Sequence, residues 1–397
     1  MKKTTQAYLP QELLFEIFKR LPLKSLLRIR SVSKSWRSLI SNPQFITLHR
    51  DYNNNNTHML VSYYPSELCA LHYDNPAFEL HSEAEFPFNK PYRFYRIVGS
   101  CNGLICVGYS CVSYANDLFL WNPSIRKIVT LPKPGIPFES HRALMLVLGF
   151  GFDPKSNDYK VVRIVYFHGR NGLHKLLPMV ELYTLSTGTW RGISAVVPPY
   201  VISNFLLQAN VNGAVHWIAH NPTKIGGFRS LIVAFDLNDE VFKEMRLPNE
   251  LAQEYPVAMS IAACGELLSL FHYYQSSSSN RGCSVWVMEK YGIDHSWTKL
   301  FNIELLQGVD LVLGSRKNGE FLVVTKDEKL VSYDPDDEQF KDLGICRTCS
   351  FVLRACSLYV SPYIESLILV DSSNGGLGND SAPDLLGEDD SEIKDRQ

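Results

Sequence analysis

Cysteine and histidine are the side chains of this chain best able to hold a metal ion, yet their spacing forms no complete site. Cys346 and Cys349 make one C-x-x-C pair, whereas structural zinc usually needs a second pair or a Cys/His partner at suitable spacing. The eleven histidines are dispersed, and His216 stands beside a tryptophan in a strand-like run. A hydrogen-bonded strand residue is its simpler role, so we expect no metal ion and no cofactor.

Motifs for catalysis are equally sparse. Gly149 and Gly151 are two positions apart, but a dinucleotide site needs a third glycine and a following helix. The sequence contains no Gly-x-Ser-x-Gly nucleophile motif, no His-Glu-x-x-His motif and no phosphate-binding loop. These features favour a protein that binds other molecules over an enzyme.

Charge is balanced over the whole chain but not along it. The 397 residues include 39 Lys/Arg and 41 Asp/Glu, and 45% are hydrophobic, which argues against a polyanion-binding or disordered chain. Residues 1–50 hold ten Lys/Arg and two Glu, whereas residues 371–397 hold eight Asp/Glu and two Lys/Arg. The pattern predicts a basic head, a globular body and a disordered acidic tail at 371–397.

Cysteine usage and the first residues bear on the cellular compartment. The nine cysteines, an odd number, are scattered through apolar runs, as in proteins of reducing compartments. Glu12 and Glu16 interrupt what would be the apolar run of an export signal. The longest mostly apolar run, Ala143 to Phe152, is too short to cross a bilayer, which takes about 20 residues. We expect a protein of the cytoplasm or nucleus without membrane contact.

The elements that would position any binding surface begin with a helical pattern in the first 50 residues. Pro10 suits the first turn of a helix, and Leu13, Ile17 and Leu21 then recur at helical spacing. A second periodic run follows over residues 26–40. Two or three helices in about 40 residues do not easily enclose a core, so their apolar faces need another surface.

After a polar linker at residues 51–57, residues 58–370 change to short apolar runs separated by turn formers, which is typical of β-strands. In four places an aromatic residue is followed seven positions later by another large apolar residue, with turn formers between them. The four pairs are Trp121 and Ile128, Tyr183 and Trp190, Phe235 and Phe242, and Tyr333 and Phe340. Each pair predicts a hairpin, and its aromatic residue is expected to lie in the core.

The spacing of these hairpins predicts the architecture. Their aromatic residues are 62, 52 and 98 positions apart, and the last interval becomes two of 51 and 47 when a weaker copy at Trp286 is included. A period near 50 with about four strands per unit is typical of a β-propeller and close to the kelch spacing. Asn-Gly pairs at Asn102, Asn212 and Asn318 predict a type I′ turn in an inner hairpin.

The predicted fold class is therefore α+β multidomain, with a short helical segment followed by an all-β, propeller-like domain of about six blades. Five blades are readable in the sequence. A sixth would need strands from both ends of the domain, residues 58–80 and 351–370, which would close the ring.

The N-terminal segment, residues 1–50, resembles the F-box of plant F-box proteins. The residues that carry the resemblance stand at fixed offsets over about 40 positions: Leu9-Pro10, Glu12-Leu13-Leu14, Glu16-Ile17, Arg20-Leu21-Pro22, Lys24-Ser25-Leu26, Val32-Ser33-Lys34, Trp36, Leu39-Ile40 and Pro43-Gln44-Phe45. Ser33 departs from the pattern, since many relatives carry Cys at this position.

Residues 58–370 resemble the F-box-associated domain of the same plant families. The matching pieces are Ser100-Cys101-Asn102-Gly103-Leu104, Trp121-Asn122-Pro123-Ser124, Gly149-Phe150-Gly151-Phe152-Asp153, Asp158-Tyr159-Lys160-Val161-Val162, Val211-Asn212-Gly213 and His216-Trp217. True kelch repeats usually carry a Gly-Gly pair in each blade. Only Gly226-Gly227 is present between residues 58 and 370, so the domain is kelch-like.

This resemblance implies a substrate-recognition subunit of an SCF-type (Skp–cullin–F-box) ubiquitin ligase, without bond chemistry of its own. The F-box would dock on a Skp-type adaptor, which joins it to a cullin and a RING protein. The propeller-like domain would hold a protein to be ubiquitinated and degraded by the proteasome. The residues that would dock on the adaptor, or support that surface from within, are Leu9, Pro10, Leu13, Ile17, Leu21, Pro22, Leu26, Val32, Trp36, Leu39 and Ile40.

The substrate-binding residues stay unassigned, and other functions stay open. Residues 132–142, 168–178 and 221–229 form longer connections that are candidate binding loops. The alternatives are an adaptor-bound scaffold and a propeller that binds a carbohydrate or another small ligand, both without ligase activity. Nucleic-acid binding is not expected, because the basic residues of the N-terminal segment cluster without a recognised nucleic-acid motif.

Overall fold

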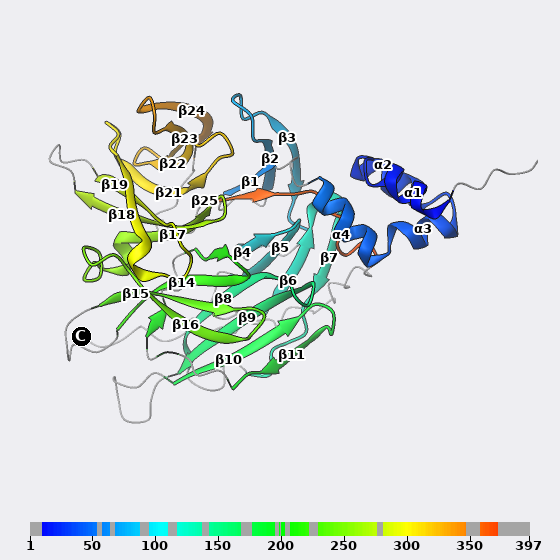
Figure 1. Cartoon of the computed structure of the whole chain (residues 1–397), viewed down its shortest axis with the longest axis horizontal. Helices are drawn as coiled ribbons and strands as arrows, with labels where there is room; N and C mark the ends of the chain where they lie inside the picture. The colour runs from blue at the N-terminus through cyan, green and yellow to red at the C-terminus, as the bar shows by residue number, and fades with distance from the viewer. Residues whose placement is uncertain are drawn as a thin grey trace, which may run out of the picture.

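The computed structural model describes residues 10–53, 58–63, 68–87, 95–109, 117–136, 143–167, 177–194, 198, 200–202, 207–221, 229–275, 281–346 and 358–371. Four short helices lie at one end of a ring of β-sheets (Figure 1). The helices are α1 (Gln11–Phe18), α2 (Leu23–Arg30), α3 (Lys34–Ile40) and α4 (Pro43–Tyr52). None of the helices in these ranges is long and apolar enough to cross a membrane.

Local sequence explains where the helices begin. Pro10 and Pro22 directly precede α1 and α2, where a missing backbone N–H costs nothing. The Ser33 hydroxyl accepts a hydrogen bond from the Trp36 backbone N–H at 3.1 Å, which caps α3. The Asn42 side chain caps α4 in the same way, and α4 continues to Tyr52. The predicted linker from residue 51 therefore begins too early, because residues 51 and 52 are helical.

The described strands form six antiparallel sheets that surround a common axis like the blades of a propeller (Figure 1). The blades, with the innermost strand first, are: blade 1, β25 (Leu358–Tyr363), β1 (His58–Tyr63), β2 (Leu68–Tyr73) and β3 (Leu80–Glu85); blade 2, β4 (Tyr95–Cys101), β5 (Leu104–Tyr109), β6 (Leu118–Asn122) and β7 (Lys127–Thr130); blade 3, β8 (Ala143–Asp153), β9 (Asp158–Phe167), β10 (Leu177–Thr184) and β11 (Thr189–Gly192); blade 4, β12 (Val201–Ile202) with β13 (Ala209–Val211), β14 (Ala214–His220), β15 (Ser230–Asp236) and β16 (Val241–Arg246); blade 5, β17 (Met259–Cys264), β18 (Leu267–Gln275), β19 (Arg281–Met288) and β20 (Trp297–Ile303); blade 6, β21 (Val309–Ser315), β22 (Phe321–Thr325), β23 (Lys329–Asp334) and β24 (Gln339–Cys346).

Strands from the two ends of the propeller sequence close the ring, as the sequence predicts for the sixth blade. β1 pairs with β25 from His58 opposite Tyr363 to Tyr63 opposite Leu358. A buried ion pair spans the neighbouring boundary with blade 6, where Arg316 Nε lies 3.0 Å from Asp74 Oδ1. The same guanidinium also donates to Glu320 at 2.6 Å, so both carboxylates share one cation.

The four predicted hairpins are confirmed at the level of single residue pairs. In each of them the aromatic residue lies directly opposite the apolar residue seven positions later. One residue in every turn has a left-handed backbone, and these residues are Arg126, Gly188, Glu240 and Glu338. Because all four hairpins join the third and fourth strands of a blade, they are the outer hairpins.

Two of the three predicted type I′ turns are confirmed. Asn102 and Gly103 have φ of 51° and 84°, and Asn212 and Gly213 have φ of 52° and 71°. The prediction for Asn318 is wrong, because only Gly319 has a positive φ there, at 90°. The Arg316 N–H donates to the Glu320 carbonyl at 2.7 Å, so this inner hairpin has a longer turn.

The core of the propeller lies between blades. Six clusters of buried apolar side chains each join two neighbouring blades, and together they continue around the ring. The aromatic residues of the hairpins belong to these clusters: Trp121, Tyr183, Phe235, Trp286 and Tyr333. This confirms the expected core role of the repeat.

The propeller has two distinct faces. β1 begins at His58 and β25 ends at Tyr363 on the face that carries the turns of the inner and outer hairpins, since successive strands of a blade are antiparallel. The four helices lie at this face, which we call the helix side (Figure 1). The opposite face, called the far side, carries the connections between blades and between the second and third strands of each blade.

Candidate functional site

The helices share a small core that they do not enclose alone. Their most buried side chains are Phe18, Leu23, Leu26, Leu39, Ile40 and Phe45. Two residues from the other end of the chain complete this cluster: Leu367, which is 0% exposed, and Val370, which is 5% exposed. The extra surface that the short helices need is thus supplied in part by residues 364–371.

This C-terminal segment is fixed to blade 2 by hydrogen bonds. The buried Asn122 side chain donates to the backbone oxygens of Ser366 and Ile368, both at 2.9 Å. A Cβ on Gly103 would lie 2.3 Å from the Ser366 hydroxyl, so only glycine allows the segment to approach the inner hairpin so closely. Asp371 then forms an ion pair with Arg30 of α2.

α4 adds a second connection between the helices and the propeller. The Arg50 guanidinium lies over the Phe152 ring, 5.0 Å from its centroid, in a cation–π contact. His49 is buried, its Nε2 lies 3.1 Å from the Leu21 carbonyl, and burial lowers the pKa of its imidazole. Asn53 donates to the His49 carbonyl at 2.8 Å. The Arg50–Phe152 contact joins α4 to blade 3, while the His49 and Asn53 contacts hold α4 within the helical segment.

The structure divides the residues that the sequence suggested for adaptor docking into two groups. Leu26, Leu39 and Ile40 are buried in the helical core, so they are not available to a partner in this conformation and support the surface from within. The exposed members are Pro10, Leu13, Ile17, Pro22 and Val32, while Leu21 and Trp36 are half-buried. Leu9 lies outside the described residues.

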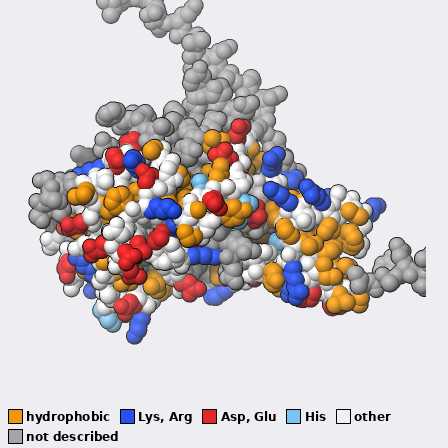
Figure 2. Space-filling model, turned by 90° about the horizontal axis from the view of Figure 1, so that it is seen from above, with side chains coloured by type: hydrophobic (Ala, Val, Ile, Leu, Met, Phe, Trp, Pro, Cys, Tyr) orange, Lys and Arg blue, Asp and Glu red, His pale blue; other side chains and the backbone are white. Residues whose placement is uncertain are grey.

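The exposed apolar residues are large side chains in contact with water. Leu13 is 50% exposed, Ile17 46% and Val32 68%, and Figure 2 shows hydrophobic side chains gathered on the helical end of the molecule. Trp36 packs edge-on against Phe18 with ring centroids 5.6 Å apart, so it serves both the core and the surface. Leu48 and Tyr52 of α4 are also 50% exposed. The helical pattern of residues 10–40 did not predict these two exposed side chains.

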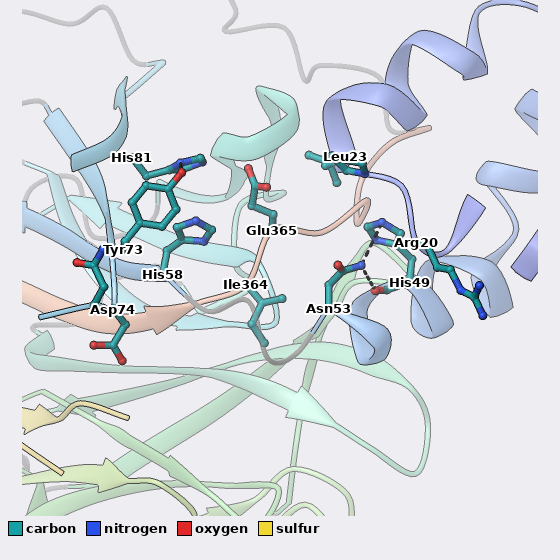
Figure 3. Close-up of a pocket in the computed structure, with 12 residues that line it drawn as sticks. Arg20, Leu23, His49, Asn53, His58, Tyr73, Asp74, His81, Ile364 and Glu365 are labelled. Carbon is teal, nitrogen blue, oxygen red and sulfur yellow. Dashed lines mark hydrogen bonds between the residues drawn. The ribbon is translucent and has the colours of Figure 1, made fainter. Parts of the chain in front are cut away.

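A cavity of about 450 Å³ separates the helices from blade 1. Figure 3 shows His49 and Asn53 on the helical wall, His58, Tyr73 and His81 on the blade wall, and Glu365 between them. The His58 and His81 rings lie 4.4 Å apart, and burial, helped by His81, lowers the pKa of His58 to about 4. His58 is therefore neutral near pH 7. Sequence reasoning missed this histidine pair because His58 and His81 lie on different strands of blade 1, β1 and β3, and no spacing motif connects them.

Metal binding finds no support in the part of the chain that the structure describes. Within it, no group of three or more His, Cys, Asp or Glu side chains could hold a metal ion. Cys349 lies outside the described residues. His216, a sequence candidate, is fully buried, with Nδ1 3.2 Å from the Ala209 carbonyl and Nε2 2.9 Å from the Tyr291 hydroxyl. It is a hydrogen-bonded strand residue, as predicted.

The three candidate binding loops connect strands at the far side. They join β7 to β8, β9 to β10 and β14 to β15, and most of their residues lie outside the described ranges. Described residues at this side include large exposed apolar side chains: Tyr255 is 64% exposed, Val257 73% and Leu306 89%. The far side therefore combines long connections with exposed apolar side chains, away from the helices.

Comparison with known families and proteins matches both parts of the chain. The F-box domain model covers residues 8–48, and the model of the F-box associated beta propeller domain covers residues 56–368. The Arabidopsis thaliana F-box protein At3g07870 is 29% identical over 400 residues, which span 84% of this chain and 87% of that protein. The Arabidopsis thaliana F-box protein CPR1 is 29% identical over 392 residues, or 94% of this chain and 91% of that protein.

Solved structures are more distant. The structure of YjhT aligns with a TM-score of 0.42 at 11% sequence identity, covering 64% of this chain and 84% of that chain. This similarity is too low to carry an argument about function.

Proposed function

Because this chain belongs to the plant F-box proteins with an F-box associated β-propeller domain, we propose that it is the substrate-recognition subunit of an SCF-type ubiquitin ligase. In this role the F-box binds a Skp-type adaptor and, through it, a cullin–RING ligase. The propeller binds a target protein for ubiquitination. The proposed place of action is the cytoplasm or nucleus.

The observation that carries the adaptor proposal is the exposed apolar surface of α1 and the α2–α3 turn. Leu13 and Ile17 are one helical turn apart on α1, and both stay about half exposed although the helical core beneath them is complete. Covering a fully exposed side chain of this size is worth roughly 1.5–3 kcal/mol. A partner that covers Leu13, Ile17 and Val32 together would gain a substantial part of its binding free energy there.

The far side of the propeller is the proposed site for the target protein. The helix side is occupied by the four helices and by residues 364–371. The far side is free of them and displays Tyr255, Val257 and Leu306. A target bound there and an adaptor bound to the F-box would not compete for the same surface.

The experiment is a binding measurement between the full chain and a plant Skp-type adaptor. The test variant is Leu13→Asp with Ile17→Asp, and the control is Val257→Asp, which places a single aspartate at an exposed apolar position of the propeller. We expect the double variant to lose adaptor binding and the control to keep it, with both variants unfolding at the wild-type temperature. Wild-type affinity in the double variant would overturn the assigned surface.

Substitution is preferable to truncation in this test. Removing residues 1–57 would uncover Leu367 and Val370, whose apolar partners are in the helices, and the shortened chain could aggregate for that reason alone. Ligase function needs a second readout, which is the turnover of proteins captured by the propeller. An adaptor complex that never promotes turnover would favour the scaffold alternative.

A further inference from the structure

The second and third helices carry an excess of positive charge. Residues 23–41 contain five basic residues and no acidic one. We call Arg28, Arg30, Lys34 and Arg37 the basic surface. Among the described residues, no carboxylate pairs with Arg28, Lys34 or Arg37, and all three are exposed. Lys and Arg side chains lie beside the hydrophobic ones on the helical end of the molecule (Figure 2).

Arg30 differs from its neighbours because it has an acidic partner. It forms an ion pair with Asp371, the last residue that the structure describes. The chain therefore leaves the described region next to the basic surface, and it does so directly after a carboxylate that binds there.

The chain that follows Asp371 has the complementary charge. Residues 372–397 contain seven Asp/Glu and two Lys/Arg. The first of these acids, Asp380, follows Asp371 by nine residues, and nine residues span at most about 30 Å. α2 and α3 have 8 and 7 residues, so at about 1.5 Å per residue each is only about 10–12 Å long. All of the basic surface lies within reach of the acidic residues.

We propose that the acidic segment 372–397 binds the basic surface of α2 and α3, as a continuation of the Arg30–Asp371 ion pair. Each exposed ion pair contributes only about 0–1 kcal/mol. The segment is tethered, however, and a short tether gives a local concentration in the millimolar range. Several weak pairs are then sufficient for the contact to form, and the contact weakens as salt screens the charges.

The contact has a consequence that rests on the function proposed above. An adaptor with an acidic docking face would be attracted by the same basic residues. The segment would compete for these charges and slow the association of the F-box with such an adaptor. The contact itself does not depend on the adaptor and can be tested without it.

Zero-length carbodiimide cross-linking of the full chain tests the contact. This reagent joins a lysine amine to a carboxylate that it touches, and Lys34 is the lysine of the basic surface. We expect Lys34 to couple to the peptide of residues 372–397 in ~0.05 M salt and to lose most of this coupling in ~1 M salt, where the Debye length is about 3 Å. Lys133 and Lys290, exposed on the propeller, are the controls.

Two variants sharpen the cross-linking result. Arg28→Gln with Arg37→Gln should reduce the Lys34 cross-link severalfold, whereas Arg246→Gln, which removes an exposed charge from β16, should not. Equal coupling of the segment to Lys34, Lys133 and Lys290 would overturn the proposal. Mixing isotopically labelled and unlabelled chains separates links within one chain from links between two copies, and links found only between copies would overturn it as well.

Adaptor kinetics test the consequence. A full chain in which the seven carboxylates after Asp371 are changed to amides should associate with an acidic adaptor at least threefold faster in ~0.05 M salt, and at the wild-type rate in ~0.5 M salt. An unchanged rate at low salt would overturn the competition. If the wild-type chain bound no adaptor at all, the proposed function would fail, while the cross-link at Lys34 would still report on the contact.

Discussion

The side-chain nitrogen of Asn122 lies 2.9 Å from the backbone oxygen of Ser366, 244 positions later in the chain. Asn122 is 0% exposed, and the same nitrogen reaches the Ile368 oxygen at 2.9 Å. These two carbonyls flank Leu367, which completes the core of the F-box helices. One amide at the end of β6 therefore holds the segment that links the two domains.

Replacing Asn122 by Ala should loosen residues 364–371. The change leaves two buried backbone oxygens without their donor, at a cost of about 1–3 kcal/mol. Amide hydrogen exchange in a peptide covering residues 364–371 should become faster, and the midpoint of urea unfolding should fall. Asn302→Ala, at an exposed position of β20, is the control. Wild-type exchange rates in the Asn122 variant would show that other contacts hold the segment.

Replacing Ile17 by Ala should weaken adaptor binding without affecting the fold. Ile17 is 46% exposed, so little packing is lost, and a hot-spot residue would raise Kd by about 30-fold, or about 2 kcal/mol. Titration calorimetry with the adaptor measures the change.

Leu26→Ala gives a contrast, because this residue lies in the helical core beneath that surface. Leu26 is 0% exposed, so its truncation opens a cavity that costs about 2–5 kcal/mol of stability. It should therefore reduce binding only through unfolding of the helices. An Ile17 variant with wild-type affinity would remove this residue from the interface.

Replacing Arg316 by Met should destabilise the closure between blades 6 and 1. Asp74 and Glu320 would lose their shared cation, and breaking one side of a buried ion pair costs about 3–5 kcal/mol. Adding Asp74→Asn should recover part of this loss, since it removes one uncompensated charge. Thermal unfolding measures both effects.

The matched control for this change is Arg246→Met, because Arg246 is 72% exposed and lies 3.8 Å from Asp294. A change within about 0.5 kcal/mol is expected there. An equal loss of stability in the two arginine variants would contradict the special role of Arg316.

Stability should fall as the pH drops below the ordinary histidine range. Burial lowers the pKa of His216 to about 4, whereas an unfolded histidine titrates near 6.5. The unfolded chain then binds a proton that the folded chain does not, so stability is complete above about pH 6.5 and decreases towards pH 4. Between pH 7.5 and 5 this residue should remove about 2 kcal/mol.

Urea unfolding at these two pH values, in the wild type and in His216→Gln, measures this contribution. The variant should lose about 2 kcal/mol less on acidification than the wild type. An equal loss in both proteins would mean that His216 does not titrate in this range.

Contacts between residues that lie near one another in the sequence could be predicted residue by residue. The pairing of Trp121 with Ile128 and of Tyr333 with Phe340 follows from aromatic spacing and turn composition, because a hairpin is a local structure. The conformation of the third Asn-Gly turn could not be predicted. The residues from Arg316 to Glu320 form a longer turn, and the Asn-Gly dipeptide alone does not indicate the turn length.

The candidate site was harder to derive. Helical periodicity placed Leu13, Ile17, Leu26 and Leu39 on the apolar faces of helices. It could not say which of these side chains are buried and which are exposed to water. That division depends on where Leu367 and Val370 pack, and these residues are more than 300 positions away. The cavity at the junction of the domains was hidden for the same reason, since its walls come from separate parts of the chain.

The pairing of β1 with β25 has a consequence during synthesis on the ribosome. Blade 1 begins at His58, but it cannot be completed until its innermost strand, Leu358–Tyr363, has been synthesised near the end of the chain. At about 5–20 residues per second, that delay is roughly 15–60 seconds. The F-box helices wait for Leu367 and Val370 over the same period. A truncated messenger RNA would therefore yield a chain that lacks both the closing strand of the propeller and the residues that complete the F-box core, although the F-box sequence is translated first.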